Sequence, residues 1–191
     1  MSDLAIGPDG KPRCNWPGMV GNELYLQYHD QEWGRPVHGE AKLFERLSLE
    51  AFQSGLSWLI ILRKREAFRA AFAGFEPAVV AEYGEADVAR LMADAGIVRN
   101  SLKIRATINN AQAILALPQG TSLESLLEQH RPAPRAPGAP VPAATAESTA
   151  LAKALKKLGF RFVGPTTAYA MMQAVGLTND HQTGCWVADE L

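Results

Sequence analysis

Apolar side chains recur at helical spacing along most of this chain. The recurrence is clearest in two stretches, with Leu43, Leu47 and Ala51 in the first and Ile104, Ile108 and Ala111 in the second. Spacings of three and four residues place side chains on one face of an α-helix. The sequence contains no run that alternates apolar and polar residues and no internal repeat. It therefore predicts an all-α fold, a compact arrangement of many short helices.

Capping and breaking residues divide the apolar stripes into separate expected helices. These helices run over 40–54, 57–72, 85–95, 100–117, 123–129, 149–158 and 165–175. Ser148 is expected to cap the sixth helix and Gly159 to end it. Residues 132–142 contain five prolines, which predicts an exposed loop without regular structure. We divide the chain into a flexible N-terminal extension, 1–12, and one helical domain, 13–187.

The composition is that of a globular protein. Of the 191 residues, 47% are hydrophobic and 20% are charged, which is enough apolar material for a core. No apolar run approaches 18 residues, so no membrane span is expected, and the first residues lack the plan of a secretory signal. We therefore expect a cytoplasmic protein. Because cytosolic thiols stay reduced, a disulfide between Cys14 and Cys185 is not expected.

The charges are distributed unevenly, although the formal net charge is only −1. Residues 1–95 carry ten Lys and Arg against fourteen Asp and Glu, whereas residues 96–165 carry nine against three. A basic segment of this kind is a candidate contact for nucleic acid. The alternative interpretation is an ordinary solvated helix face.

The only two cysteines lie near opposite ends of the chain, and His181 precedes Cys185 by four positions. A His and a Cys at this spacing can bind one metal ion from a helix or from a tight turn. Cys14 would be a third ligand. The candidates for a fourth ligand are His29, His38 and His130. The alternative is a pair of buried, unreactive cysteines.

Glu50 falls on an apolar helical face, in series with Leu47 and Ser54. A carboxylate in such a place lines a pocket or pairs with a cation, here Arg46 or Arg63. Burial would raise the pKa of Glu50 unless hydrogen-bond donors stabilise the anion.

Five aromatic residues lie within 43 positions of one another, four of them in poorly periodic segments. They are Trp16, Tyr25, Tyr28, Trp33 and Trp58. Near a buried carboxylate, such residues can form a slot for a flat ring. Ordinary core packing is the alternative interpretation.

The stretch 94–111 predicts two helices joined by a tight turn. The first helix is expected to end at Gly96. The N–H groups exposed at such a turn can bind a phosphate at the start of the next helix. Arg99, Lys103 and Arg105 would add positive charge there.

Taken together, these segments resemble one family, DNA-3-methyladenine glycosylase I, a branch of the helix-hairpin-helix glycosylases. The matching blocks are RCNW (13–16), LYLQYHDQEWG (24–34), LEAFQSGLSW (49–58), LRKREAFRAAF (62–72), DAGIVRNSLKI (94–104), ALKKLGFRFVG (154–164) and QAVGLTNDHQTGC (173–185). They occur in the family's order and at similar spacing. The resemblance covers about residues 13–185, and several blocks in register are far more specific than any single motif.

The resemblance implies a zinc site that ties the two ends of the chain together. The matching ligands are Cys14, His29, His181 and Cys185. Four protein ligands leave no position for a water molecule, which implies one structural Zn²⁺ and not a hydrolytic centre. The metal would close a loop of 171 residues and so remove much of the unfolded chain's entropy.

The resemblance also implies the reaction. Such an enzyme flips an alkylated purine, 3-methyladenine, out of double-stranded DNA and hydrolyses its N-glycosidic bond. Tyr28 and Trp58 would form stacking walls, with Tyr25 and Trp16 nearby. Glu50 would be the catalytic residue, because its carboxylate accepts hydrogen bonds from the base and favours cationic species.

The hairpin at about 94–104 would hold the DNA backbone through main-chain amides, with Gly96 allowing close approach and Arg99 and Lys103 adding charge. Many helix-hairpin-helix glycosylases carry a catalytic Asp after the hairpin, but residues 95–146 contain no Asp. No lysine nucleophile is evident either. We expect a monofunctional, monomeric enzyme that does not cleave the strand.

Three positions depart from the family's pattern. Ala51 stands where Gly is usual, Ser54 where Ala is usual, and Ser101 where a basic residue is common. Ala51 could narrow the slot and Ser101 could weaken DNA contact. The alternatives to a glycosylase are a non-catalytic module that binds damaged DNA on the same scaffold and a zinc hydrolase unrelated to DNA, which would need an open coordination position.

Overall fold

The structure, a computed structural model, describes residues 4–136 and 138–191, and helices dominate that part of the chain. In chain order the elements are β1 (Ala5–Ile6), β2 (Pro12–Arg13), α1 (Glu23–Gln31), α2 (Glu40–Gln53), α3 (Trp58–Ala71), the 3₁₀ helix η1 (Ala73–Phe75), α4 (Pro77–Val80), α5 (Glu85–Ala93), α6 (Ser101–Leu115), α7 (Leu123–Gln129), α8 (Ala146–Lys157), α9 (Pro165–Ala174) and the 3₁₀ helix η2 (Trp186–Glu190). The all-α class expected from the sequence is confirmed.

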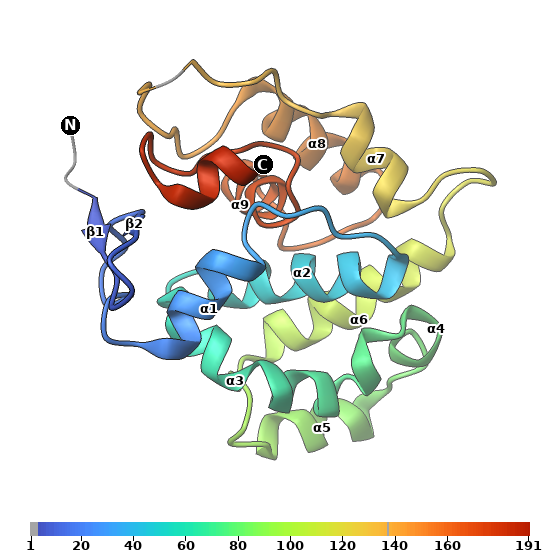
Figure 1. Ribbon diagram of the computed structural model, residues 1–191. Coiled ribbons are helices and arrows are strands. Elements are labelled where there is room, and N and C mark those ends of the chain that lie inside the picture. The colour runs from blue at the N-terminus through green and yellow to red at the C-terminus, as the bar shows by residue number, and fades with distance from the viewer. Residues whose placement is uncertain (1–3, 137) are drawn as a thin grey trace.

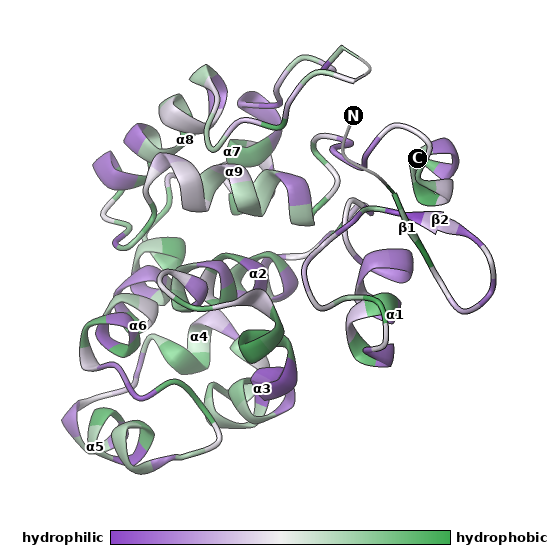
Figure 2. Cartoon of the chain, turned by 90° about the vertical axis from the view of Figure 1, so that its left-hand side faces the viewer, coloured by the Kyte–Doolittle hydropathy of each residue, from purple (hydrophilic) through white to green (hydrophobic). Residues whose placement is uncertain are grey.

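Helix α2 lies at the centre of the molecule. Helices α7, α8 and α9 lie on one side of it and α3 to α6 on the other (Figures 1 and 2). Every residue from Leu43 to Phe52 is buried, so α2 is covered all round and not along one stripe. The buried run includes polar residues that must find partners inside the protein, and this requirement shapes the site described below.

The expected helices occur within a few residues of their expected bounds, and 123–129 coincides with α7. The cap of α8 differs. Thr145 caps this helix, because its hydroxyl accepts a hydrogen bond from the Ser148 N–H while the Ser148 hydroxyl accepts one from the Thr145 N–H. Ser148 is therefore the third residue of the helix in a reciprocal capping box, not the cap itself.

Helix α1 was not expected from the sequence. Its buried residues are Tyr28 and His29, both of which carry polar atoms, so the helix has no apolar stripe for a periodicity argument to detect. The short elements η1 and α4 were missed as well, because one turn of helix is too short to show a period.

The segment before the domain makes a small β pairing. Ala5 pairs with Arg13 and Ile6 with Pro12 in antiparallel register, and this hairpin lies beside the C-terminal segment (Figure 2). Residues 1–3 of the proposed extension lie outside the described residues. The division into an extension over 1–12 and a domain over 13–187 stays a prediction.

The described residues of the proline-rich loop 132–142 contain no helix or strand. The loop is attached to the C-terminal segment, since the Arg135 Nε donates a 2.9 Å hydrogen bond to the buried Asp180 carboxylate. Pro137 lies outside the described residues. Among the described helices, none has the length and apolar character needed to cross a membrane.

Candidate functional site

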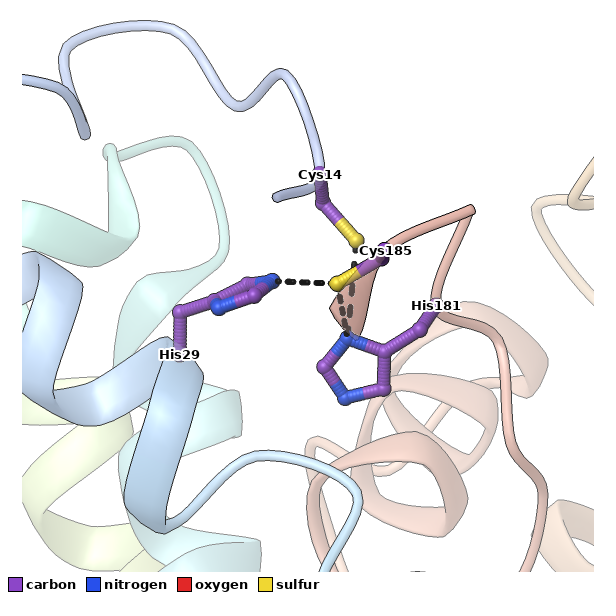
Figure 3. Close-up of side chains that lie close together, drawn as sticks. All are labelled: Cys14, His29, His181 and Cys185. Atoms are coloured by element: carbon purple, nitrogen blue, oxygen red, sulfur yellow. Dashed lines mark hydrogen bonds between the residues drawn. The ribbon is translucent and has the colours of Figure 1, made fainter. Parts of the chain in front are cut away.

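The two ends of the chain meet at a cluster of two cysteines and two histidines (Figure 3). The Cys14 Sγ lies 3.5 Å from the His181 Nδ1, and the Cys185 Sγ lies 3.6 Å from both the His181 Nδ1 and the His29 Nε2. All four ligand atoms lie within 4.8 Å of one another, and all four residues are buried.

This arrangement fits a tetrahedral metal ion. Metal bonds of about 2.0–2.3 Å to nitrogen and sulfur correspond to tetrahedral edges of about 3.3–3.8 Å, and the three closest ligand pairs are 3.5–3.6 Å apart. The donors are two thiols and two imidazoles, which suit a borderline-soft cation. The cluster can therefore hold a metal that joins the two ends of the chain.

Neighbouring groups orient the ligands. The His29 Nδ1 is 2.8 Å from Asp30 Oδ1, and Asp30 is in turn bound by the Arg13 guanidinium at 2.7–3.1 Å. The second nitrogen of His181 faces the Trp33 carbonyl oxygen at 3.3 Å. A partner on the far nitrogen fixes each ring and its tautomer, as is usual for metal-binding histidines.

The thiols are electrostatically coupled. A hydrogen bond from Cys14 lowers the pKa of Cys185, while that hydrogen bond and burial raise the pKa of Cys14. Two buried thiolates side by side repel each other. A divalent cation would stabilise both thiolates.

The structure identifies the fourth member of the cluster, which spacing alone left open. His29 joins it, whereas the His38 Nδ1 contacts Glu124 at 2.7 Å and the His130 Nδ1 contacts the Leu126 carbonyl oxygen at 2.8 Å. The His181-to-Cys185 step is made by a turn and not by a helix.

Glu50 faces a cavity of about 280 Å³ beside this cluster. The cavity is lined by Trp16, Pro17, Tyr25, Tyr28, Trp33, Glu50, Gln53, Trp58, Ala170 and Gln173. A second hollow shares Glu50, Gln53 and Ala170 and extends past Ser54 and Leu56 to the first turn of α9. All five residues expected at the pocket are therefore brought together. Ala51, although buried, is not part of either lining.

The aromatic residues form the walls of the cavity. The Tyr28 and Trp58 ring centroids are 5.2 Å apart, and the Trp16 ring lies 5.5 Å from Tyr25 and 4.8 Å from Trp33. Trp33, Gln53 and Gln173 line the cavity but were not assigned to it from the sequence. Trp33 stood in the aromatic group noted there. Nothing local marks the two glutamines.

The metal cluster and the cavity share a wall. The Trp16 ring packs edge-on against the His29 ring at 4.9 Å, and the Trp33 ring packs against the His181 ring at 4.6 Å. Both tryptophans also line the cavity. The cluster therefore supports two of the aromatic side chains that shape the pocket.

The Glu50 carboxylate is buried without a hydrogen-bond donor. Glu50 is 6% exposed, and no described residue donates a hydrogen bond to it. Burial raises its pKa to about 7, and the positive charge of Arg46 opposes that rise. Arg46, one of the two cations proposed as its partner, is hydrogen-bonded to Glu32 instead. The cavity thus contains a carboxyl group that titrates near neutrality.

The hairpin between α5 and α6 is braced against α3. The Lys64 Nζ donates to the carbonyl oxygens of Ala95 and Gly96 at 2.8 and 3.2 Å. A Cβ on Gly96 would lie 3.0 Å from the Ala67 Cβ, so glycine permits close packing here. The Gly96 N–H donates a 2.7 Å hydrogen bond to Asp94 Oδ1. Arg99 is exposed on this hairpin.

Lys103 differs from the expectation of a phosphate contact. Its ammonium donates to the carbonyl oxygens of Phe52 and Ser54 at 2.8 and 2.6 Å, and the residue is only 7% exposed. Those carbonyls end α2, where a cation is favoured by the helix dipole. Lys103 therefore fastens α6 to the end of the helix that carries Glu50.

Comparisons with known proteins agree along nearly the whole chain. A family model described as methyladenine glycosylase matches residues 16–188. DNA-3-methyladenine glycosylase 1 of Escherichia coli (strain K12) is 46% identical over 179 residues, covering 91% of this chain and 95% of its own. A crystal structure of 3-methyladenine DNA glycosylase I has a TM-score of 0.86 at 46% identity, covering 91% of this chain and 98% of that one. A variant of such an enzyme in complex with 3-methyladenine has a TM-score of 0.83 at 35% identity, covering 88% and 94%.

The buried carboxyl predicts a pH-dependent gain in stability from Glu50→Gln. The folded-state pKa near 7 lies above the unfolded value of 4.5, so folding favours the protonated acid. The stability that Glu50 contributes is complete below pH 4.5 and is lost as the pH rises through 7. Glu50→Gln should therefore be close to neutral at pH 5 and stabilising by about 3 kcal/mol at pH 8.

Urea unfolding at several pH values measures this difference. The exposed Glu82 provides a control, because Glu82→Gln should show no gain that grows with pH. A Glu50→Gln effect of equal size at pH 5 and pH 8 would contradict the prediction.

Proposed function

Since this chain belongs to the methyladenine glycosylase family, we propose that it is a DNA glycosylase that excises 3-methyladenine from alkylated DNA. One observation carries the proposal. The Glu50 carboxyl is buried without a hydrogen-bond donor in a cavity with aromatic walls, large enough for a flat base. A carboxylate without a donor in such a place lowers stability. Its presence in this cavity points to a ligand that pairs with it.

The cavity suits a cationic purine. Methylation at N3 places a positive charge on adenine in DNA, and aromatic faces such as those of Tyr28 and Trp58 attract a cation. An ionised Glu50 would favour this base over neutral adenine and accept hydrogen bonds from its edge. Burial and the Glu50 carboxylate raise the pKa of the Tyr28 hydroxyl, which therefore stays protonated and able to donate.

The reaction is a hydrolysis at the sugar. The damaged nucleotide is flipped from the duplex, which costs less for a poorly paired base. The bond between the sugar C1′ and the base N9 breaks, and its electron pair leaves with the base, which becomes neutral 3-methyladenine. Water adds to C1′ and releases a proton, leaving an abasic site. Glu50 stabilises the positive charge that develops on the sugar.

We propose that the hairpin binds the DNA backbone through main-chain amides. Within residues 4–136 and 138–191, no group accepts a hydrogen bond from the N–H of Val98 or Arg99. These free donors stand just before the N-terminus of α6, a favourable place for a phosphate. The exposed Arg99 adds charge, and Gly96 contributes by its close packing and not by its own N–H.

These different environments predict different roles for Arg99 and Lys103. Arg99→Met should weaken binding to duplex DNA and reduce the slope of log K against log salt by about one, because one phosphate contact is lost. Lys103→Met should leave the slope unchanged and lower the free energy of unfolding by about 2 kcal/mol, because its ammonium bonds the end of α2. Fluorescence anisotropy at several salt concentrations and urea unfolding measure the two effects. Equal changes in slope for both variants would contradict the assignment.

We propose that the metal cluster holds one Zn²⁺. Two thiolates and two imidazoles at tetrahedral spacing are a common donor set for structural zinc. With four protein ligands the ion would act as a cross-link between the chain ends and leave no position for substrate. Its effect on the reaction would be indirect, because Trp16 and Trp33 pack on the ligand histidines and line the cavity.

Loss of a ligand should therefore affect stability. Cys14→Ser should release the metal and lower the free energy of unfolding by about 5 kcal/mol, the loop-closure contribution expected for a cross-link of this length. Elemental analysis and urea unfolding measure both effects. His38→Ala is a matched control, since this histidine contacts Glu124 away from the cluster, and it should keep the metal. Unchanged metal content in Cys14→Ser would overturn the ligand assignment.

The activity itself is tested with methylated duplex DNA. The wild-type protein should release free 3-methyladenine, and Glu50→Ala should release it at least a hundredfold more slowly, as for the loss of a principal electrostatic group. Chromatography of the released bases measures the rate. Undiminished release by Glu50→Ala would keep the function but overturn the site. No release by folded, metal-loaded wild-type protein would favour a module that binds damaged DNA without cutting it.

A further inference from the structure

Arg46 is a buried cation one helical turn before Glu50. Both residues lie on α2, four positions apart, which places them on the same face of the helix. Arg46 is 8% exposed and Glu50 is 6% exposed. Arg46 is not part of the cavity lining, so its charge acts from behind the wall.

One carboxylate, that of Glu32, and one aromatic ring hold the Arg46 guanidinium in place. Its Nη2 donates a 2.7 Å hydrogen bond to the Glu32 carboxylate, and Arg65 binds the same carboxylate through both oxygens at 2.6 and 2.9 Å. The guanidinium carbon lies 5.6 Å from the centre of the Tyr28 ring. The Arg46 Nη1 is buried and has no hydrogen-bond partner among the described residues. The guanidinium is thus fixed against the back of the cavity wall, with its Nη1 amino group left unpaired.

We propose that Arg46 is a positioning residue whose fixed positive charge favours the ionised form of Glu50 in the cavity. The consequence for catalysis rests on the proposed function, because an ionised Glu50 is what attracts a cationic base. The electrostatic effect on Glu50 does not depend on that function and can be measured separately.

Among the described residues that line the cavity, Glu50 is the only one that can carry a charge near neutral pH, and burial raises the pKa of the Tyr25 hydroxyl, which stays neutral. From α1, Tyr28 faces it and is held in its neutral form by burial. From α3 and α9, the lining residues are Trp58, Ala170 and Gln173, all of them uncharged. Burial raises the pKa of Glu50, and Arg46 is the group that opposes the rise. Without Arg46, Glu50 would be mostly protonated at neutral pH and would lose its preference for a cation.

The indirect geometry has a physical advantage. A direct salt bridge from Arg46 would occupy the carboxylate oxygens that the base must use. From behind the Tyr28 ring, Arg46 favours the anion and leaves those oxygens free.

The test measures the titration of Glu50 directly. Protein labelled with ¹³C at the glutamate carboxyl carbon is titrated by NMR, and the Glu50 signal is assigned by its loss in Glu50→Gln. Arg46→Gln removes the charge but keeps a donor for Glu32, and it should raise the titration midpoint of Glu50 by about one pH unit. Arg46→Met serves as a second neutral variant if Arg46→Gln does not fold.

Two controls separate charge from structure. Arg65→Met breaks the same Glu32 network, but its charge is not among those that act on Glu50, so the midpoint should stay within about 0.3 of wild type. Arg46→Lys keeps a cation and should shift the midpoint less than Arg46→Gln does. An unchanged midpoint in Arg46→Gln, or an equal shift in Arg65→Met, would overturn the proposal.

The catalytic consequence is read from rate against pH on methylated DNA. The substrate base is a fixed cation, so the acid limb should follow Glu50. Arg46→Gln should be roughly fivefold slower than wild type at pH 7 and nearly equal at pH 9, because a one-unit rise in a pKa near 7 changes the ionised fraction about that much. Equal rates at both pH values, together with a shifted NMR midpoint, would overturn the catalytic role. If the wild type releases no base, the proposed function is wrong. The NMR titration still shows whether Arg46 lowers the pKa of Glu50.

Discussion

The contact between the two ends of the chain supports the rest of the site. Cys14 and Cys185 lie 171 positions apart, yet both sulfur atoms lie within 3.6 Å of the His181 Nδ1, and the Cys185 Sγ also lies 3.6 Å from the His29 Nε2. The rings of His29 and His181 pack against Trp16 and Trp33, and both tryptophans also line the Glu50 cavity. A metal bound by this cluster would be a long cross-link that restricts the unfolded chain, and the cluster itself packs against side chains that line the cavity. Stability and pocket shape therefore depend on one cluster.

Helix α2 supplies the second constraint. Because it is covered on all sides, its polar residues are buried with the apolar ones. Two of the four have partners: Glu45 is bound by Arg69 and Arg46 by Glu32, whereas the Ser48 hydroxyl has no partner among the described residues. Glu50 is the acidic residue of the helix that no donor satisfies, and burial raises its pKa to about 7. Above about pH 7 this carboxyl is ionised without a donor, which costs stability. This loss of stability is consistent with a binding site in which a cationic base pairs with the Glu50 carboxylate.

Hydrogen bonds connect the hairpin to the helices that line the cavity. Lys103 lies in α6 directly after the hairpin and bonds the carbonyls at the end of α2, and Lys64 from α3 holds the hairpin from the other side. A phosphate bound at the hairpin would thus sit at a fixed distance from Glu50. This division of labour, in which one surface anchors the backbone and another recognises the base, is general in DNA recognition.

The sequence by itself determined the helical class and the places of most helices, because each depends on local spacing and capping. The buried residues of α1 are Tyr28 and His29, which form no apolar stripe, so the spacing pattern did not predict this helix. The resemblance identified Cys14, His29, His181 and Cys185 as one group, whereas spacing alone left three histidines open. Only the tertiary structure decided which long side chain meets which partner. The Lys103 ammonium bonds the end of α2, Arg46 pairs with Glu32 and not with Glu50, and Gln173 reaches the cavity from α9. These contacts join residues far apart in the chain, and a flexible cation can reach several acceptors. The choice among those acceptors is made by packing, which no local pattern records.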